Sequence, residues 1–462
     1  MPVSKRYKGM GGREAAFLCL QGERKHFMKF RYKKITTAIL ALMITAAAAM
    51  TFTACGDNGS DSSADTGSGK GNGTQKEEAV DLSILCVGDI MAHSVNIKSA
   101  YDASTGTYDF NDNYEYVTKY ISAADLALCN METTFQGTAP RGYPTFNAPD
   151  ELAAAVRNAG FDVAITSNNH MMDSGFDGMQ RTLEVLRSQG FVTVGSRYDG
   201  EDSYAMTEVK GVNIGIVAYT YETTGAGDSG VTINGTRIGE DSQKLINSFN
   251  YNELETTDYD KIQEDIDDAR GAGADIVICY FHWGNEYQRE PDSHQLEMAQ
   301  RAADMGADII FASHPHVLQK VDVVTSESGK NVPVFYSMGN FISNQRTETL
   351  PSIANKKYTE QGMIAYVDVE YMKGTDKILS ETIRVLPTWV DRYNGSSDYR
   401  IIPLDGDLDS NETLLKSGHL SRAKQALSDV KDLIGEKWLS GVTIQAEGTS
   451  GDEENEDDAE AA

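Results

Sequence analysis

Cysteine is scarce in this chain, and the few that occur are not arranged as metal-binding pairs. The five are Cys19, Cys55, Cys86, Cys129 and Cys279, widely separated and without any CxxC spacing. This pattern excludes a structural zinc site of the cysteine type and argues against a disulfide-stapled scaffold. The last three lie inside apolar runs, which predicts buried thiols in the core.

Basic residues are also in short supply. Lys and Arg total 41 against 69 Asp and Glu, and the formal net charge is -28. A protein that binds nucleic acid without specificity needs a basic face to displace counterions, so we expect no nucleic-acid partner. So acidic a chain also repels polyanions unless metal ions intervene. Hydrophobic residues make up 40% of the 462, which is enough to form a core.

Long apolar runs are absent except for one near the N-terminus. Residues 35–54 carry no charge and follow a basic segment, a pattern typical of a secretion signal. The run ends in Phe-Thr-Ala-Cys55, which resembles the bacterial lipobox, whose cysteine becomes lipidated. An uncleaved membrane anchor is the alternative. Both interpretations place the body outside the cytoplasm and attached to the cell membrane. Met28 is a better signal-peptide start than Met1.

Composition divides the chain into five segments. We expect residues 1–54 to be the leader and lipoprotein signal peptide, and residues 55–79, rich in Gly, Ser and Asp, to be a flexible tether. Residues 80–390 form the main domain. Residues 391–446 form a C-terminal extension, which looks helical from Glu412 to Leu439, and residues 447–462 are an acidic disordered tail.

Strand and helix signals alternate through the main domain. Runs rich in Val, Ile and Leu, such as 82–87, 126–129 and 275–281, are interspersed with amphipathic segments such as 151–158 and 294–305. Alternation of this kind predicts an α/β layered domain.

Polar side chains able to bind metal follow five of the predicted strands. Each alone has an ordinary explanation, as a helix cap, a turn residue or a buried core histidine. Together they indicate a site, because sites in open α/β sheets gather beyond the carboxyl ends of the strands. The set comprises Asp89, Glu132, Asn169, His170, His282, His314 and His316. Carboxylates and imidazoles without a thiolate favour Zn, Mn or Fe, and the number of ligands fits two metals that share a carboxylate.

Six motifs occur in order between about residues 82 and 387. They are Gly-Asp-Ile-Met from Gly88, Asn-Met-Glu from Asn130, Asn-Asn-His from Asn168, His-Trp-Gly from His282, Ser-His-Pro-His from Ser313 and Tyr-Ser-Met-Gly-Asn-Phe from Tyr336. They resemble those of CapA proteins, the capsule-synthesis, poly-γ-glutamate-associated members of the calcineurin-like metallophosphoesterase superfamily. The resemblance implies a four-layer α/β/β/α sandwich with a two-metal centre between its sheets.

The resemblance also implies a role for each residue. Asp89 and His316 would hold the first metal, Glu132 would bridge, and Asn169, His282 and His314 would hold the second. His170 would be the acid that protonates the leaving oxygen in metal-assisted hydrolysis. Candidates to orient the ligands or face the substrate are His93, Asn168, Ser313, Asn340 and Arg346.

Two departures from the superfamily pattern bear on the first metal. The superfamily has Asp-x-His where this chain has Asp89-Ile90-Met91, so the usual histidine is missing, and Glu132 replaces a bridging aspartate. His93 is a candidate substitute, the alternative being a histidine at the start of a helix. Arg346 would suit an anionic substrate, the alternative being a surface arginine.

Three functions remain open at this point. The first is a membrane-tethered, extracytoplasmic, CapA-like protein of capsule synthesis or export, with a metal-dependent phosphoesterase-like site for an anionic polymer or phosphoester. The second is a non-catalytic, polymer-binding subunit that works beside the membrane subunits of a poly-γ-glutamate synthase. A stand-alone secreted nucleotidase is the third. Kinship of fold alone does not decide among them.

Overall fold

The structure is a computed structural model that describes residues 78–223, 230–250, 256–393 and 398–447. The expected signal peptide, the lipobox Cys55, the tether up to residue 77 and the tail from residue 448 lie outside these residues. Among the helices of the described ranges, none is both long enough and apolar enough to cross a membrane.

The first sheet has nine strands and combines a parallel half with an antiparallel half. The parallel half consists of β1 (Glu78–Ile90), β4 (Leu126–Met131), β5 (Val163–Ile165) and β6 (Val192–Val194), with β16 (Asn340–Ile342) beside the end of β1. The antiparallel half continues from the other side of β1 with β17 (Gln361–Lys373), β18 (Lys377–Tyr393), β19 (Asp398–Pro403) and β20 (Val442–Gln445).

The second sheet has seven strands and is mostly parallel. Its parallel strands are β11 (Ser248–Asn250), β8 (Val212–Glu222), β12 (Ile276–His282), β13 (Ile309–Ser313) and β15 (Asn331–Phe335). Antiparallel strands β7 (Ala205–Val209) and β14 (Val321–Thr325) complete it. Two small ribbons stand apart: β2 (Tyr101–Asp102) with β3 (Thr107–Tyr108), and β9 (Thr232–Ile233) with β10 (Thr236–Arg237).

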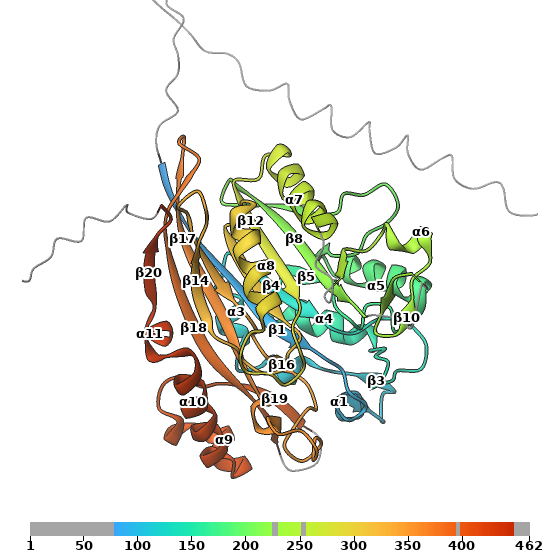
Figure 1. Ribbon diagram of the computed structural model, residues 1–462. Coiled ribbons are helices and arrows are strands. Elements are labelled where there is room, and N and C mark those ends of the chain that lie inside the picture. The colour runs from blue at the N-terminus through green and yellow to red at the C-terminus, as the bar shows by residue number, and fades with distance from the viewer. Residues whose placement is uncertain (1–77, 224–229, 251–255, 394–397, 448–462) are drawn as a thin grey trace, which may run out of the picture. The chain divides into compact units, whose positions relative to one another are not determined.

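The two sheets pack face to face, and helices cover their outer faces (Figure 1). Side chains alternate along each strand: in β12, Ile278 packs between the sheets, whereas Cys279 packs against helices. The outer face of the first sheet contacts α1 (Ser94–Ala100), α2 (Asn111–Tyr114), α3 (Thr118–Ile121), α4 (Asp150–Asn158) and α5 (Gly175–Ser188). The second sheet contacts α7 (Thr256–Gly271) and α8 (Ser293–Asp304). This is the α/β/β/α sandwich that was expected.

The remaining helical segments are mostly short. They are α6 (Glu240–Gln243), the 3-10 turns η1 (Lys356–Tyr358) and η2 (Leu408–Ser410), and the C-terminal α9 (Glu412–Ser417), α10 (Leu420–Ile434) and α11 (Glu436–Ser440). The single helix expected over Glu412–Leu439 is thus three helices. Gly418 and Gly435 have φ of 75° and 84°, and a backbone in that region ends a helix.

The C-terminal extension shares the first sheet with the main domain. The boundary expected at residue 390 falls inside β18, and β19 and β20 both pair with that strand. Helices α10 and α11 lie along β18 (Figure 1). Extension and main domain therefore fold as one unit.

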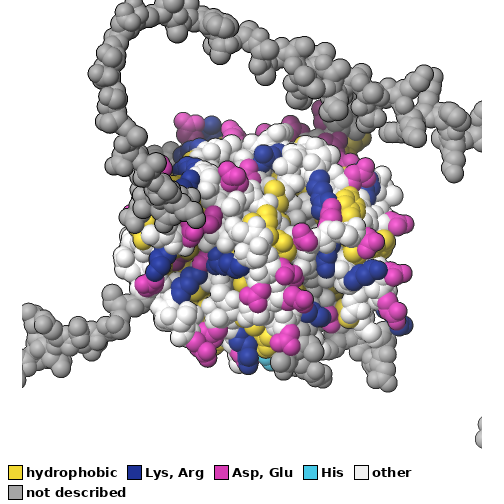
Figure 2. Space-filling model, turned by 90° about the horizontal axis from the view of Figure 1, so that it is seen from above, with side chains coloured by type: hydrophobic (Ala, Val, Ile, Leu, Met, Phe, Trp, Pro, Cys, Tyr) yellow, Lys and Arg dark blue, Asp and Glu magenta, His cyan; other side chains and the backbone are white. Residues whose placement is uncertain are grey.

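The predicted core thiols are confirmed for the described cysteines. Cys86, Cys129 and Cys279 are buried and unbridged. On the face seen in Figure 2, Asp and Glu side chains are interspersed with Lys and Arg rather than segregated from them. That mixture is ordinary for a solvated surface.

Candidate metal centre

Polar residues from both sheets meet at the carboxyl ends of the parallel strands. Asp89 is the penultimate residue of β1, Glu132 directly follows β4, and His282 is the last residue of β12. The loop after β5 carries residues 168–170, and the loop after β13 carries residues 314–316. Because the sheets face each other, these ends converge, and one oxygen or nitrogen from each of Asp89, Glu132 and His282 lies within 4.8 Å of the others.

A close approach of two backbones sets the position of Asp89. The Asp89 amide donates to the carbonyl of Gly339 at 3.0 Å, and a Cβ atom at Gly88 would overlap that same carbonyl oxygen. Gly88 is therefore required for packing between β1 and the turn before β16.

Asp89 and His316 form a buried pair. The Nδ1 atom of His316 lies 2.9 Å from Oδ2 of Asp89, and neither side chain is more than 1% exposed. Burial alone would raise the pKa of Asp89, but the hydrogen bond and charge of His316 bring it below its ordinary value. Burial alone would lower the pKa of His316, yet Asp89 raises it. Each partner therefore favours the charged form of the other.

Glu132 has an oxygen that the described residues leave unsatisfied. Its Oε2 atom accepts a 3.3 Å hydrogen bond from Asn130, whereas buried Oε1 has no hydrogen-bond partner in the described ranges. Oε1 lies 3.8 Å from Nε2 of His282, 3.8 Å from Nε2 of His316 and 4.0 Å from Nε2 of His170. Burial, and then the charge of Asp89, raise the pKa of Glu132 well above its ordinary value.

His282, His314 and Asn169 form the other side of the cluster. Nε2 of His282 lies 2.9 Å from Oδ1 of Asn169, and the rings of His282 and His314 are 4.8 Å apart. Nδ1 of His314 is buried without a hydrogen-bond partner among the described residues. Burial lowers the pKa of His282 to about 3 and that of His314 well below its usual range. Both rings are therefore neutral at physiological pH, the form that ligates metals.

His170 stands beside this cluster with its ring orientation fixed. Its Nδ1 atom lies 2.7 Å from Oδ2 of Asp173, and its ring meets the Phe146 ring edge-on at 4.6 Å. Its backbone amide donates to Oδ1 of Asn168 at 3.1 Å. The contact with Asp173 directs Nε2 toward Glu132 and favours a protonated Nδ1.

These residues fit a divalent metal. Oε1 of Glu132 and Nδ1 of His314 are buried and have no hydrogen-bond partner among the described residues. A buried polar atom without a partner lowers the stability of the fold, and a metal ion bound by these atoms would remove that cost. Carboxylate, imidazole and amide donors suit Mn, Zn or Fe. The geometry fixes neither the number of ions nor their identity.

Several expected supporting residues do contact the cluster. Nδ2 of Asn168 donates to Oδ1 of Asn130 at 3.1 Å, and Oγ of Ser313 lies 3.5 Å from Nδ1 of His282. Nδ2 of Asn340 donates to the backbone carbonyl of His316 at 3.3 Å. Each contact orients a candidate ligand or its backbone.

The two remaining expected residues, His93 and Arg346, differ in their surroundings. His93 precedes α1 near the cluster, and its Nδ1 accepts a 3.2 Å hydrogen bond from the Asn344 amide; its part in the metal site stays a prediction. Arg346 is 2% exposed, donates to the carbonyl of Val390 at 2.8 Å and lies 3.5 Å from Glu360. Both expectations for Arg346 are therefore wrong: its guanidinium is neither at the surface nor available to a substrate.

Sequence reasoning gave no role to three residues that the structure brings to the cluster. Asn130 bridges Asp89 and Glu132 through its Nδ2 atom, and its place in the Asn-Met-Glu motif was a usable signal. Asp173 lies only three positions after His170. Tyr221, whose ring is 4.7 Å from that of His314, is the penultimate residue of the hydrophobic strand β8, and no sequence pattern singled it out.

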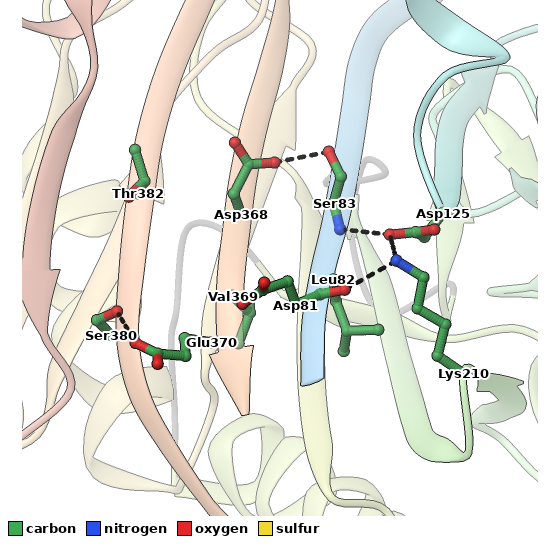
Figure 3. Close-up of a pocket in the computed structure, with 10 residues that line it drawn as sticks. All are labelled: Asp81, Leu82, Ser83, Asp125, Lys210, Asp368, Val369, Glu370, Ser380 and Thr382. Carbon is green, nitrogen blue, oxygen red and sulfur yellow. Dashed lines mark hydrogen bonds and ion pairs between the residues drawn. The ribbon is translucent and has the colours of Figure 1, made fainter. Parts of the chain in front are cut away.

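An acidic hollow, separate from the candidate metal centre, lies toward the beginning of β1 (Figure 3). Its volume is about 430 Å³, and its wall includes Asp81, Asp125, Asp368 and Glu370. Asp125 is paired with Lys210 at 2.7 Å, and Asp368 accepts from Ser83 at 2.6 Å. No histidine is among the residues that line it, so its donors differ from those of the candidate metal centre.

Comparisons with known proteins agree with the motif resemblance. The family profile described as "Bacterial capsule synthesis protein PGA_cap" matches residues 83–345. The capsule biosynthesis protein CapA of Bacillus anthracis is 29% identical over 299 residues, which cover 62% of this chain and 66% of that protein. The PGA biosynthesis protein CapA of Bacillus subtilis is 28% identical over 271 residues, covering 57% and 64%.

Two further matches have lower sequence identity to this chain. A probable polyglutamine synthesis accessory protein of Mycobacterium tuberculosis is 22% identical over 239 residues, covering 48% of this chain and 57% of that protein. A solved structure from Thermus thermophilus, that of the protein TT1561, aligns with 65% of this chain and 97% of its own at a TM-score of 0.31 and 8% identity. The chain thus spans just under two thirds of the Bacillus relatives.

Proposed function

Because this chain belongs to the bacterial capsule synthesis protein (PGA_cap) family, we propose that it acts in capsular poly-γ-glutamate synthesis or export through a divalent-metal site with phosphoesterase-like chemistry. The expected signal sequence and lipobox would tether it to the outer side of the cell membrane. The observation that carries the proposal is Oε1 of Glu132, which has no hydrogen-bond partner among the described residues and is buried within 4.0 Å of three histidine rings.

The residues divide the chemical work between them. Asp89, Glu132, Asn169 and the histidines at 282, 314 and 316 would hold the metal, which would supply Lewis-acid stabilisation to a phosphoryl group. His170 would deliver a proton from Nε2 to the leaving oxygen, as general acids do. Asp173, 2.7 Å from Nδ1, would hold the ring in the orientation that this transfer needs.

A non-catalytic function is the second candidate, and the names of the Bacillus relatives favour it. Those names refer to synthesis of a polymer and not to hydrolysis. In that case the site would bind carboxylates of an anionic polymer through its metal, and membrane subunits of a poly-γ-glutamate synthase would be the partners. Such a site has no need of a proton donor beside its ligands.

Substitution of His170 by Ala separates the two functions. We would measure Mn²⁺ binding, hydrolysis of bis-p-nitrophenyl phosphate and p-nitrophenyl phosphate, and affinity for poly-γ-glutamate. Hydrolysis that is lost in His170→Ala while Mn²⁺ binding persists supports catalysis. His294→Ala, on α8 and outside the cluster, is the matched control and should behave as the unaltered protein.

No hydrolysis by the Mn²⁺-loaded protein, together with metal-dependent binding of poly-γ-glutamate, would favour the polymer-binding function. General acids typically contribute about 10²–10⁴-fold to a rate, so the loss expected in His170→Ala is large enough to measure.

A further inference from the structure

Helix α10 of the C-terminal extension holds a buried carboxylate of the loop between β16 and β17. Nη2 of Arg422 lies 2.5 Å and 2.6 Å from the two oxygens of Glu360, which is 2% exposed. The same carboxylate accepts from the Trp389 indole at 3.1 Å and from the Thr347 amide at 3.1 Å. Arg346, at 3.5 Å, is the other cation beside it. Loss of Arg422 would leave a buried charge only partly compensated.

Asp429, two turns further along α10, contacts the same end of that loop. Its carboxylate accepts from Nε2 of Gln361 at 3.1 Å and from Nζ of Lys357 at 3.3 Å. Its backbone carbonyl accepts from Nη2 of Arg289 at 3.3 Å, and the Arg289 guanidinium lies 3.7 Å from the centre of the Tyr358 ring. Helix α10 therefore contacts both the 343–361 loop and the loop that follows β12.

These two loops contact the backbone of the candidate metal centre. Nδ2 of Asn340 donates to the carbonyl of Thr359 at 3.0 Å and to that of His316 at 3.3 Å. Oγ1 of Thr359 in turn donates to the carbonyl of Gln345 at 2.9 Å. The position of the His316 backbone thus depends on the 343–361 loop.

Tyr287 connects the second loop to the same place. Its φ is 65°, a left-handed conformation that non-glycine residues adopt only when the surroundings enforce it. Its amide donates to the carbonyl of Pro315 at 2.7 Å, and its carbonyl accepts from Asn355 of the 343–361 loop at 2.8 Å. Pro315 lies between the candidate ligands His314 and His316, so Tyr287 and Asn340 both hold the backbone of that segment.

We propose that Arg422 and Asp429 are positioning residues for the candidate metal centre, acting through the 343–361 loop on the His314–His316 segment. The inference rests on the proposed metal site. The family match ends at residue 345, so both residues lie outside the matched region. The extension is accordingly required for full metal affinity although it contributes no ligand.

The test compares Arg422→Met with two matched variants of the same helix. Lys424→Ala removes a 2.6 Å ion pair with Asp409, and both partners of this pair belong to the extension. Among the described residues, the pair involves no residue of the 343–361 loop. Arg422→Lys keeps the charge and should restore part of the function. Two quantities are measured: Mn²⁺ affinity by calorimetry, and amide hydrogen exchange of peptides covering 284–292, 309–318 and 343–361.

Arg422→Met should bind Mn²⁺ about 10-fold more weakly than the unaltered protein, the lower end of the range for outer-shell substitutions at metal sites. Its three peptides should exchange faster, whereas peptides of the central strands should not. Lys424→Ala should match the unaltered protein in both measurements, and Arg422→Lys should be intermediate. If Arg422→Met does not fold, Asp429→Asn, which removes only a charge, takes its place.

Equal Mn²⁺ affinity in Arg422→Met and the unaltered protein would overturn the positioning role, even if the loops exchange faster. A loss of affinity in Lys424→Ala as large as in Arg422→Met would also overturn it, because general weakening of the helix would then explain both. If the unaltered protein binds no Mn²⁺, the proposed metal site itself fails, and this inference fails with it.

Discussion

Replacing Glu132 by Gln removes one negative charge from the middle of the cluster and leaves the side-chain volume nearly unchanged. In the metal-free protein, this carboxylate is fully buried, faces Asp89 and has one oxygen without a partner among the described residues. A buried unsatisfied polar group costs about 1–3 kcal/mol. Because the Gln amide cannot ionise beside Asp89, we expect Glu132→Gln to raise the free energy of unfolding of the metal-free protein by about 1–3 kcal/mol.

Bound metal should offset this gain in the stability of Glu132→Gln. A ligand present at 100 times its Kd stabilises the native state by about 2.7 kcal/mol. If the neutral amide weakens metal binding about 100-fold, the same metal concentration stabilises the variant by only about 0.4 kcal/mol. The difference, about 2.3 kcal/mol, offsets most or all of the advantage seen without metal.

Urea unfolding followed by circular dichroism, with EDTA and then with Mn²⁺, measures both quantities. Glu208→Gln on β7 is an exposed control and should change neither. If Glu132→Gln is destabilised equally with and without Mn²⁺, the carboxylate is an ordinary structural residue. The reasoning from its unpartnered oxygen would then be refuted.

Three further predictions concern proton linkage and packing. Burial raises the pKa of Glu381 well above its ordinary value. The contribution of Glu381 to the free energy of unfolding is therefore complete below about pH 4.5 and is lost as the pH rises through the folded-state pKa. Glu381→Gln should reduce this loss of stability in urea titrations between pH 5 and 9. Because Asp89 raises the pKa of His316, metal binding must displace a proton, and Mn²⁺ affinity measured by calorimetry should fall as the pH is lowered from 8 to 6. Gly88→Ala should cost about 1–3 kcal/mol or prevent folding, since its Cβ meets the Gly339 carbonyl.

Each of these predictions has a clear contrary result. An unchanged pH dependence in Glu381→Gln would mean that this carboxyl titrates normally in the folded protein. Mn²⁺ affinity that does not vary between pH 6 and 8 would exclude proton displacement from His316. A fully stable Gly88→Ala variant would mean that β1 and the Gly339 turn can separate without affecting the fold.

The parallel half of the fold was accessible from the sequence because its strands are buried on both faces. Such strands appear as continuous apolar runs, for example Ile276–His282. The antiparallel strand Lys377–Tyr393 was not predicted, since it mixes polar and apolar residues along its length. Val442–Gln445 was missed as well, because a four-residue strand has too little periodicity to detect.

The convergence of the candidate ligands was predictable for a different reason. Parallel strands end at a common edge, so residues placed after several strands are brought together whatever their separation in the sequence. The burial of Arg346 could not be predicted, because its surroundings include Glu360 and Val390 from elements later in the chain. No local pattern around Arg346 carries that information.

The most direct test of the account is the metal content of the purified protein after dialysis against Mn²⁺. We predict at least one tightly bound ion per chain in the unaltered protein and its loss in Asp89→Ala and His282→Ala. Asp368→Asn, which alters the acidic hollow of Figure 3, should retain the ion. The assignment of this cluster as a metal centre would be contradicted if the unaltered protein bound no metal. It would also be contradicted if Asp89→Ala and His282→Ala bound as much metal as the unaltered protein.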